Sequence, residues 1–266
     1  SRASPSSIVL NSSSAQFIVG SVCRIQPHLL RSWLRLHLCV MGWFEALLFF
    51  SRHARTYISN AFPDLADRFT EDPKKLRSIA NQIIEFYPPF DNFLLAFKTL
   101  HDDLKSFGDL DHLDLRRRRP IDHFATLALR AETCLRFAIY ESNYPRRPMS
   151  PTSDSLSGYI EDISRACGEA FPPDQTITKS DIRDLTRMTQ SRDSKIANVK
   201  ALRLPNASAR QSAQVRAYLG CQLARNYFAH HYDLDHEMVK GPIGQFILAS
   251  TIFTVWDLLT KYFDIT

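Results

Sequence analysis

The chain has 266 residues, 44% of them hydrophobic and 23% charged. This composition is typical of a globular protein, and the length suits one large domain or two small ones. A net charge of +5 permits a polyanionic partner such as RNA without requiring one. Only 8 glycines disfavour β folds rich in tight hairpins. Five widely spaced cysteines without a CxxC pair predict no zinc finger and fit a reducing cytoplasm.

The N-terminal part of the chain begins with a Ser-rich segment, residues 1–28, which we expect to be peripheral and not a signal peptide. Residues 29–59 have the apolar spacing of a helix. The apolar run 36–50 inside this helix is shorter than the ~20 residues that a membrane span needs. We therefore expect a buried helix and no membrane association.

The next elements are also helical. Helices are expected from Pro73 to the pair Pro88-Pro89, and over about 90–106. Residues 109–119 then combine acidic residues with four consecutive arginines. We take this change as the boundary between an N-terminal helical module, 29–119, and a helical domain, 120–266.

The C-terminal part again shows helical periodicity. After Pro120 the expected elements are a long helix, a Pro/Ser-rich loop over 145–157, shorter helices over 156–170 and 179–197, and strong helices over about 207–228 and 234–263. Pro242 either kinks the last helix or marks its true start. No strand alternation extends beyond a few residues, so the fold class is expected to be all-α.

Three residues near the junction of the two strongest helices suit phosphodiester chemistry: Arg225, Asn226 and His230. Arginine offers a rigid fork of donors to a phosphate, and histidine moves a proton near neutrality. In a continuous helix Arg225 and His230 would point about 140° apart. Their convergence therefore requires either a helix end between them or a second copy of the chain.

This segment resembles the signature of the HEPN superfamily, in which an arginine, usually followed by a polar residue, precedes a histidine by four to six residues. Residues 225–232 also resemble the Arg-x4-His-x-Tyr form of HEPN toxins, with Tyr232 in the last place. The resemblance covers about 120–266. It implies a HEPN-like helical bundle with Arg225, Asn226 and His230 as catalytic residues.

The resemblance further implies a metal-independent endoribonuclease without a cofactor, a toxin or effector of prokaryotic antiviral defence. It implies a homodimer. We further expect a cytoplasmic protein that cleaves single-stranded RNA or tRNA, with the RNA's own 2′-hydroxyl as the nucleophile. A regulatory protein partner is also implied, such as an antitoxin nucleotidyltransferase, a CRISPR component or a short Argonaute. Candidate substrate-binding residues are Tyr232, His231, Arg116 and Arg117.

Several alternatives remain open at this point. Arg225 could pair with Asp233 or Asp235, His230 could cap a helix, and His231 could be the catalytic histidine instead. Arg116 and Arg117 could belong to a solvated loop. A metal site is not expected, because no metal-binding spacing is convincing.

Further alternatives concern the position of Glu132 and the function of the protein. Glu132 is expected on an exposed helix face with Arg136, although a polar residue there could reach the cleft. The alternative functions are a non-catalytic HEPN-type module for dimerisation or partner binding, and an unrelated helical scaffold.

Overall fold

The computed structural model describes residues 27–82, 87–106, 114–142, 154–167, 192–204, 207–230 and 241–263. The chain divides into two compact units, residues 1–43 and 44–266. Within the described ranges every regular element is a helix and none is a strand. The all-α fold class is therefore confirmed for this part of the chain.

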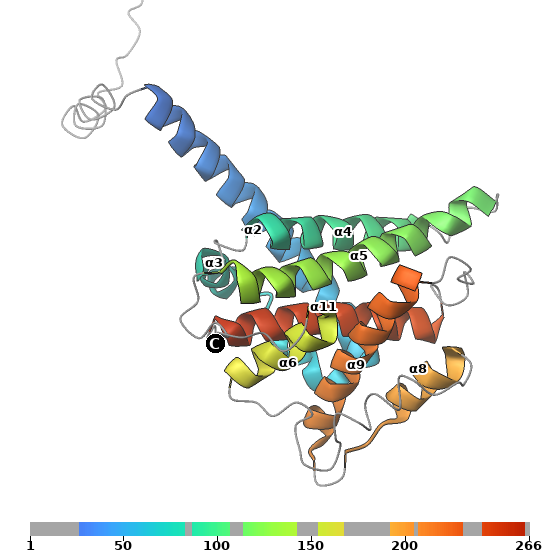
Figure 1. The fold of residues 1–266 in the computed structure, drawn as a ribbon. Helices are drawn as coiled ribbons and strands as arrows, with labels where there is room; N and C mark the ends of the chain where they lie inside the picture. The colour runs from blue at the N-terminus through green and yellow to red at the C-terminus, as the bar shows by residue number, and fades with distance from the viewer. Residues whose placement is uncertain are drawn as a thin grey trace, which may run out of the picture. The chain divides into compact units, whose positions relative to one another are not determined.

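The helix α2 (Pro27–Ala61) begins in the first unit and supplies the first helix of the second (Figure 1). The expected helix over 29–59 is thus confirmed. The second unit continues with η1 (Pro63–Arg68), α3 (Pro73–Gln82), α4 (Tyr87–Ser106), α5 (Asp114–Tyr140), α6 (Leu156–Ala166), α8 (Arg192–Ala201), α9 (Ala209–His230) and α11 (Pro242–Tyr262).

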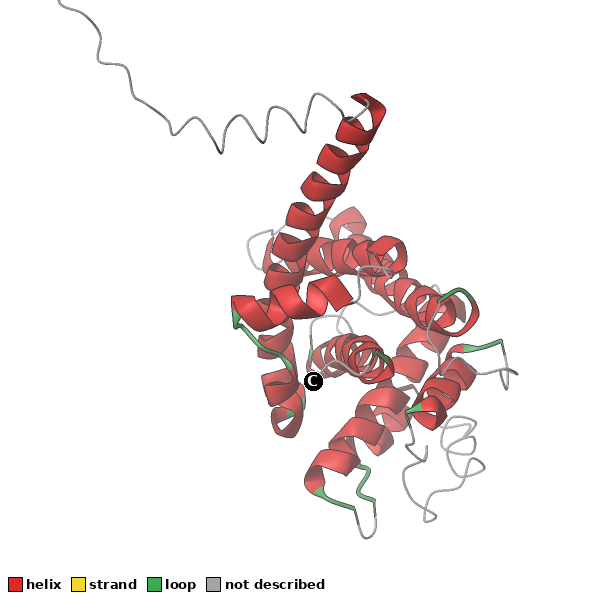
Figure 2. Ribbon diagram, turned by 90° about the vertical axis from the view of Figure 1, so that its left-hand side faces the viewer, coloured by secondary structure: helices red, strands yellow, loops and turns green. Residues whose placement is uncertain are grey.

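The core of the second unit is built around α11. Every side chain from Phe246 to Thr260 is buried, and Figure 2 shows this helix nearly end-on with other helices around it. A helix that is apolar on all sides must be covered on all sides. By length and composition α11 could also cross a membrane, but 89% of its most apolar stretch is buried inside the unit. This burial is what a bundle's central helix requires.

Aromatic rings fill the space between α2, α4 and α11. The ring of Phe50 lies 5.1 Å from that of Phe97 and 5.8 Å from that of Trp256, measured between centroids. Phe69 stacks on Trp256 at 5.7 Å. These separations are in the favourable range for aromatic pairs, which adds to the burial of their large surfaces. The cluster joins the second half of α2 to the core helix.

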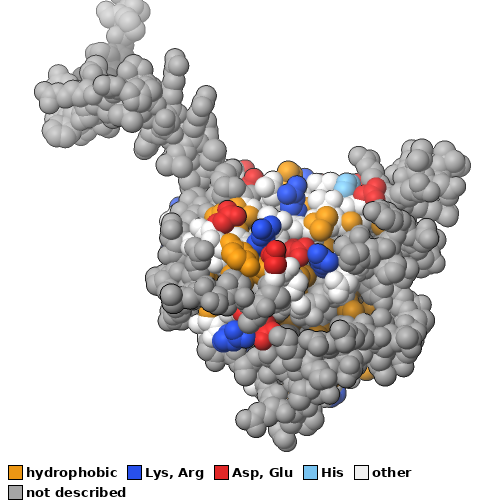
Figure 3. All heavy atoms as spheres, in the orientation of Figure 1, with side chains coloured by type: hydrophobic (Ala, Val, Ile, Leu, Met, Phe, Trp, Pro, Cys, Tyr) orange, Lys and Arg blue, Asp and Glu red, His pale blue; other side chains and the backbone are white. Residues whose placement is uncertain are grey.

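The helices α4 and α5 run antiparallel along one side of the unit (Figure 1). The Cys134 thiol of α5 donates to the carbonyl of Pro89 near the start of α4, at 3.2 Å. At the other end, His123 Nδ1 lies 2.5 Å from the Asp103 carboxylate. Figure 3 shows the outer face of this region, where charged side chains of both signs are interspersed with hydrophobic ones.

A buried carboxylate, that of Asp257 on α11, ties three elements together. Its Oδ1 accepts from Arg68 Nε of η1 at 3.0 Å. Its Oδ2 accepts from the Tyr218 hydroxyl of α9 at 2.6 Å and lies 2.9 Å from Lys261 Nζ. A buried charge is tolerated only when it is paired and hydrogen-bonded in this way. The carboxylate therefore fixes η1 and α9 against α11.

The basic run before Pro120 does not separate two modules. The expected boundary between 119 and 120 falls inside α5, which begins at Asp114, and residues 44–266 form one compact unit. Leucine and arginine are strong helix formers, and they outweigh the single proline here. The basic run is therefore helical, which contradicts a charged loop at Arg116 and Arg117.

Other element boundaries also differ from the expectations. Pro88 and Pro89 do not end a helix, because both lie in the first turn of α4, where the missing N–H of proline is not needed. The last helix begins at Pro242, the second of the two possibilities for that residue. The expected helical stretches over 179–191 and 234–240 lie outside the described residues.

Candidate functional site

The helix α9 carries the Arg225 segment, and its start is set by a local cap. The Ser208 hydroxyl accepts from the Gln211 N–H at 3.1 Å, and the Gln211 side chain accepts from the Ser208 N–H at 2.8 Å. This reciprocal pair is a capping box. The apolar residues spaced by four, Val215, Leu219 and Leu223, are buried as their spacing predicts.

A close helix crossing fixes where the end of α9 lies. Ala217 contacts Thr254, and Gly220 contacts Ser250. Residue numbers on α11 therefore decrease along the contact as those on α9 increase. The two helices are therefore antiparallel neighbours. A Cβ atom at Gly220 would lie 2.7 Å from the Ser250 Cβ and 3.0 Å from the Phe246 ring. Glycine lets the helices approach closely, and the crossing holds the last turns of α9 near the start of α11.

Arg225 forms an ion pair with Glu132 of α5, with Nε 3.0 Å from the Glu132 Oε2. Their side chains are 28% and 18% exposed, so the pair sits at the edge of the bundle. The contact uses Nε, and the two Nη nitrogens have no partner among the described residues. A guanidinium held through Nε can present its other two nitrogens to an anion as a fork.

The pairing of Glu132 corrects one expectation. The sequence predicts that Glu132 lies on an exposed face with Arg136, but the structure places it against Arg225, 93 positions along the chain. Helical spacing carries the signal that would have found it. Glu132 lies four residues after Ala128 and three before Leu135, both buried, so it borders the inner face of α5.

His230 is the last residue of α9, and the helix is unbroken from Arg225 to His230. The helix therefore does not end between the two residues, which was one of the two ways in which Arg225 and His230 could converge. Along one continuous helix the two positions face directions about 140° apart. The two positions therefore lie on different sides of the helix, and Asn226 between them is exposed.

Of the remaining candidate residues, some lie within the described part of the chain and others do not. Arg116 and Arg117 lie in the first turns of α5. His231, Tyr232, Asp233 and Asp235 lie outside the described residues, so the choice between His230 and His231 and the proposed pairing with Asp233 or Asp235 remain predictions.

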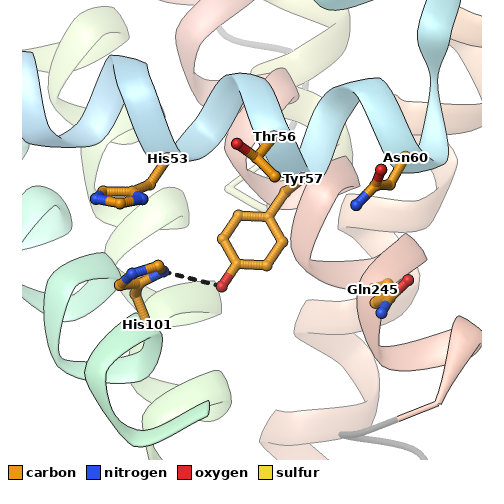
Figure 4. Close-up of a pocket in the computed structure, with 6 residues that line it drawn as sticks. All are labelled: His53, Thr56, Tyr57, Asn60, His101 and Gln245. Carbon is orange, nitrogen blue, oxygen red and sulfur yellow. Dashed lines mark hydrogen bonds between the residues drawn. The ribbon is translucent and has the colours of Figure 1, made fainter. Parts of the chain in front are cut away.

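Apart from the Arg225–Glu132 pair, a cluster of polar residues lines a cavity of about 170 Å³ between α2, α4 and α11 (Figure 4). Its residues are His53, Thr56, Tyr57, Asn60, His101 and Gln245. The Tyr57 hydroxyl lies within hydrogen-bonding distance of His101 Nδ1, at 3.0 Å. The imidazole rings of His53 and His101 lie 4.2 Å apart between centroids.

Burial and charge set the titration of this cluster. Burial lowers the pKa of His53, and the neighbouring Arg52 lowers it further. Burial also lowers the pKa of His101, followed by the charge of His53. Burial raises the pKa of the Tyr57 phenol. At neutral pH the three rings are therefore uncharged, and each can both donate and accept a hydrogen bond.

Sequence reasoning missed this cavity. Its four residues on α2 have the spacing i, i+3, i+4, i+7 and share one helix face. That polar face was a usable signal. The contribution of His101 and Gln245 was not foreseeable, because it depends on how α4 and α11 pack. Among the described residues no group of three or more His, Cys, Asp or Glu could hold a metal ion.

Comparison with protein-family models, with curated proteins and with solved structures finds no match to this chain. The functional argument therefore rests on the geometry of the Arg225–Glu132 ion pair and of the residues that line the cavity.

Proposed function

We propose that this protein is a metal-independent endoribonuclease that acts as a homodimer through the Arg225, Asn226 and His230 segment. The observation that carries the proposal is the ion pair of Arg225 with Glu132 at the edge of the bundle. The pair orients a guanidinium whose Nη nitrogens remain available to a phosphate. The HEPN-like character of the bundle is part of the same proposal and rests on the motif.

The helix geometry supports a site composed from two chains. The positions of Arg225 and His230 lie about 140° apart around the helix axis, so His230 of one copy would complete the site of Arg225 in the other. Two-fold dimers place the same surface of both copies in contact, which builds such composite sites in pairs. The exposed Asn226 would then lie at the interface or against the RNA.

The proposed reaction needs no nucleophile from the protein. The 2′-hydroxyl of the RNA attacks the adjacent phosphorus and loses its proton to a base, and the bond from phosphorus to the 5′-oxygen breaks. The leaving oxygen takes up a proton, giving a 2′,3′-cyclic phosphate and a 5′-hydroxyl. His230 transfers a proton, and Arg225 stabilises the charge that develops on the phosphate.

The test is cleavage of single-stranded RNA or tRNA in EDTA by the full chain. We expect His230→Ala to lower the rate about 10²–10⁴-fold and Arg225→Ala about 10²–10³-fold. Arg225→Lys should not restore activity, because an ammonium lacks the planar fork. Arg130→Ala is the matched control, since this arginine is exposed on α5, two positions before Glu132.

RNA with a 2′-methoxy group at the cleavage point should resist cutting, as should DNA. A requirement for Mg²⁺ or Mn²⁺, or cleavage of the blocked RNA, would contradict this mechanism. A regulatory protein partner that controls the activity is part of the proposal, and cleavage should also be assayed in extracts of cells that express the protein.

A non-catalytic dimerisation or partner-binding module is the second candidate. The unbroken helix favours it, because the positions of Arg225 and His230 lie about 140° apart around the helix axis instead of side by side. Formation of a dimer without cleavage in any of these assays would support this function instead.

A further inference from the structure

The cavity between α2, α4 and α11 is separate from the Arg225 segment, and no step of the proposed cleavage uses it. Its volume of about 170 Å³ is below the roughly 300–1,000 Å³ of pockets for drug-sized ligands. It therefore suits one small ring system or a single chemical group rather than a whole large ligand.

The side chains that line the cavity favour a ligand with a flat, uncharged ring and polar edges. Figure 4 shows the two imidazoles on one side of Tyr57 and the carboxamides of Asn60 and Gln245 on the other. Among the residues that the structure describes, no carboxylate or cationic side chain lines the cavity. Aromatic side chains stack on flat rings, and carboxamides pair with the edges of nucleobases through two hydrogen bonds.

The carboxamides are available for such pairing. Asn60 and Gln245 are exposed, and within the described part of the chain neither side chain has a hydrogen-bond partner. They approach the cavity from different helices, α2 and α11, so that a ring between them would meet donors and acceptors from both.

Two basic residues are neighbours of the histidine pair along the helices. Lys105 lies one helical turn after His101 on α4, Arg52 directly precedes His53 on α2, and both are exposed. The charges of both lower the pKa of His53. Lys98 is also close, but it is paired with Asp102 at 2.5 Å. Two cations therefore remain without a counter-charge among the described residues. An anionic group attached to the bound ring would be stabilised there.

We propose that this cavity binds the base of one unpaired nucleotide, with the attached phosphate directed toward Arg52 and Lys105. The nucleotide could belong to single-stranded RNA or be free, because both present the same base and phosphate. The inference does not rest on the proposed nuclease activity, since it concerns binding by other residues on other helix faces.

Calorimetric titration of the full chain tests the proposal, with 5′-AMP, 5′-CMP, adenosine, inorganic phosphate and a 2′-methoxy RNA octamer as probes. We expect one saturable site for at least one mononucleotide, with adenosine bound at least several-fold more weakly than AMP at low salt. The double substitution Asn60→Ala/Gln245→Ala should weaken nucleotide binding about tenfold or more.

A second set of variants tests the role of the two cations. Arg52→Ala/Lys105→Ala should weaken binding of AMP but leave that of adenosine almost unchanged. Asn81→Ala and Lys75→Ala on α3 are matched controls at exposed positions, and neither should alter binding. Circular dichroism of each variant establishes that the fold is intact.

The octamer identifies the source of the nucleotide. Octamer binding that is tighter than AMP binding and weakened by the same cavity variants would identify RNA. Saturable AMP binding with which the octamer does not compete would identify a free nucleotide, and both results support the proposal. It is overturned if no nucleotide or octamer binds saturably, if the cavity variants leave binding unchanged, or if phosphate alone binds as tightly as AMP.

Discussion

At the scale of single residues, the surroundings of Arg225 matter more than the motif it belongs to. A short pattern such as Arg-x4-His recurs by chance, but a guanidinium fixed through Nε by a carboxylate from another helix is a specific arrangement. Glu132 is thus a positioning residue for Arg225 in the proposed site. Its effect on chemistry is indirect and depends on the orientation of the guanidinium.

Gly220 gives the first prediction. Gly220→Ala should destabilise the protein by about 1–3 kcal/mol, because the added methyl group would overlap Ser250 where α9 packs on α11. The measurement is the urea concentration at half-unfolding. The same substitution at Gly42, where a Cβ atom would meet nothing within 4 Å, should instead stabilise the helix by about 0.5–1 kcal/mol.

A double-mutant cycle sharpens this test. Ser250→Gly removes the overlapping side chain, so Gly220→Ala should cost clearly less in that background than in the wild type. An equal cost in both backgrounds would show that the contact with Ser250 is not the cause.

Asp257 gives the second prediction. Asp257→Ala should lower the free energy of unfolding by about 3 kcal/mol or more, because Arg68 and Lys261 would lose the buried carboxylate that neutralises them. The exposed pair of Arg210 with Asp67 is the control. Asp67→Ala should change stability by no more than about 1 kcal/mol. Comparable losses for the two variants, measured by thermal unfolding, would contradict the role of burial.

At the scale of elements, the packing of α2 on α4 should make stability sensitive to pH. Both His53 and His101 have pKa values below the ordinary 6.5, so the unfolded chain binds protons more tightly than the folded one. Stability should therefore fall as pH drops below about 6.5 and stop falling below the folded-state pKa values. At higher pH both states are uncharged and the two histidines contribute no pH dependence.

The other charged groups around the pair act in known directions. Arg52, Lys98 and Lys105 favour the uncharged imidazoles, and Asp102 opposes them. Unfolding midpoints at pH 8.0, 6.5 and 5.0 check the prediction. A double variant, His53→Gln/His101→Gln, should lose part of the decline between pH 6.5 and 5.0. A decline of the same size in this variant would assign the effect to other groups.

The helices could be predicted from the sequence, but most contacts between them could not. Periodicity places α9 correctly because Val215, Leu219 and Leu223 lie on one buried face. The pairing of Glu132 with Arg225 was missed because it joins residues 93 positions apart. The same holds for His53 and His101, whose contact is set by tertiary packing rather than by local pattern.

At the scale of the whole molecule, the geometry of α9 makes complementation between subunits the decisive experiment for the proposed site. Arg225→Ala and His230→Ala chains should each be inactive alone. In a two-fold dimer with composite sites, the mixed dimer would contain one intact Arg225–His230 pair. Random association at equal amounts should restore about a quarter of wild-type RNA cleavage.

The mixture should be prepared by unfolding and refolding the two chains together, because stable dimers exchange slowly. Wild-type protein treated identically is the control. A mixture as inactive as its components, with mixed dimers demonstrated by differently tagged chains, would contradict composite sites.

The position of α11 in the chain has a consequence for synthesis in the cell. All other described helices precede it, yet α2, α4, α5, α6 and α9 pack against it. At roughly 5–20 residues per second, α2 is completed about 10–40 s before α11 has been made. During that time the aromatic faces of α2 and α4 have no central helix to cover them. We therefore expect the nascent chain to depend on chaperones, and messages interrupted before residue 242 to yield chains for degradation rather than a smaller folded protein.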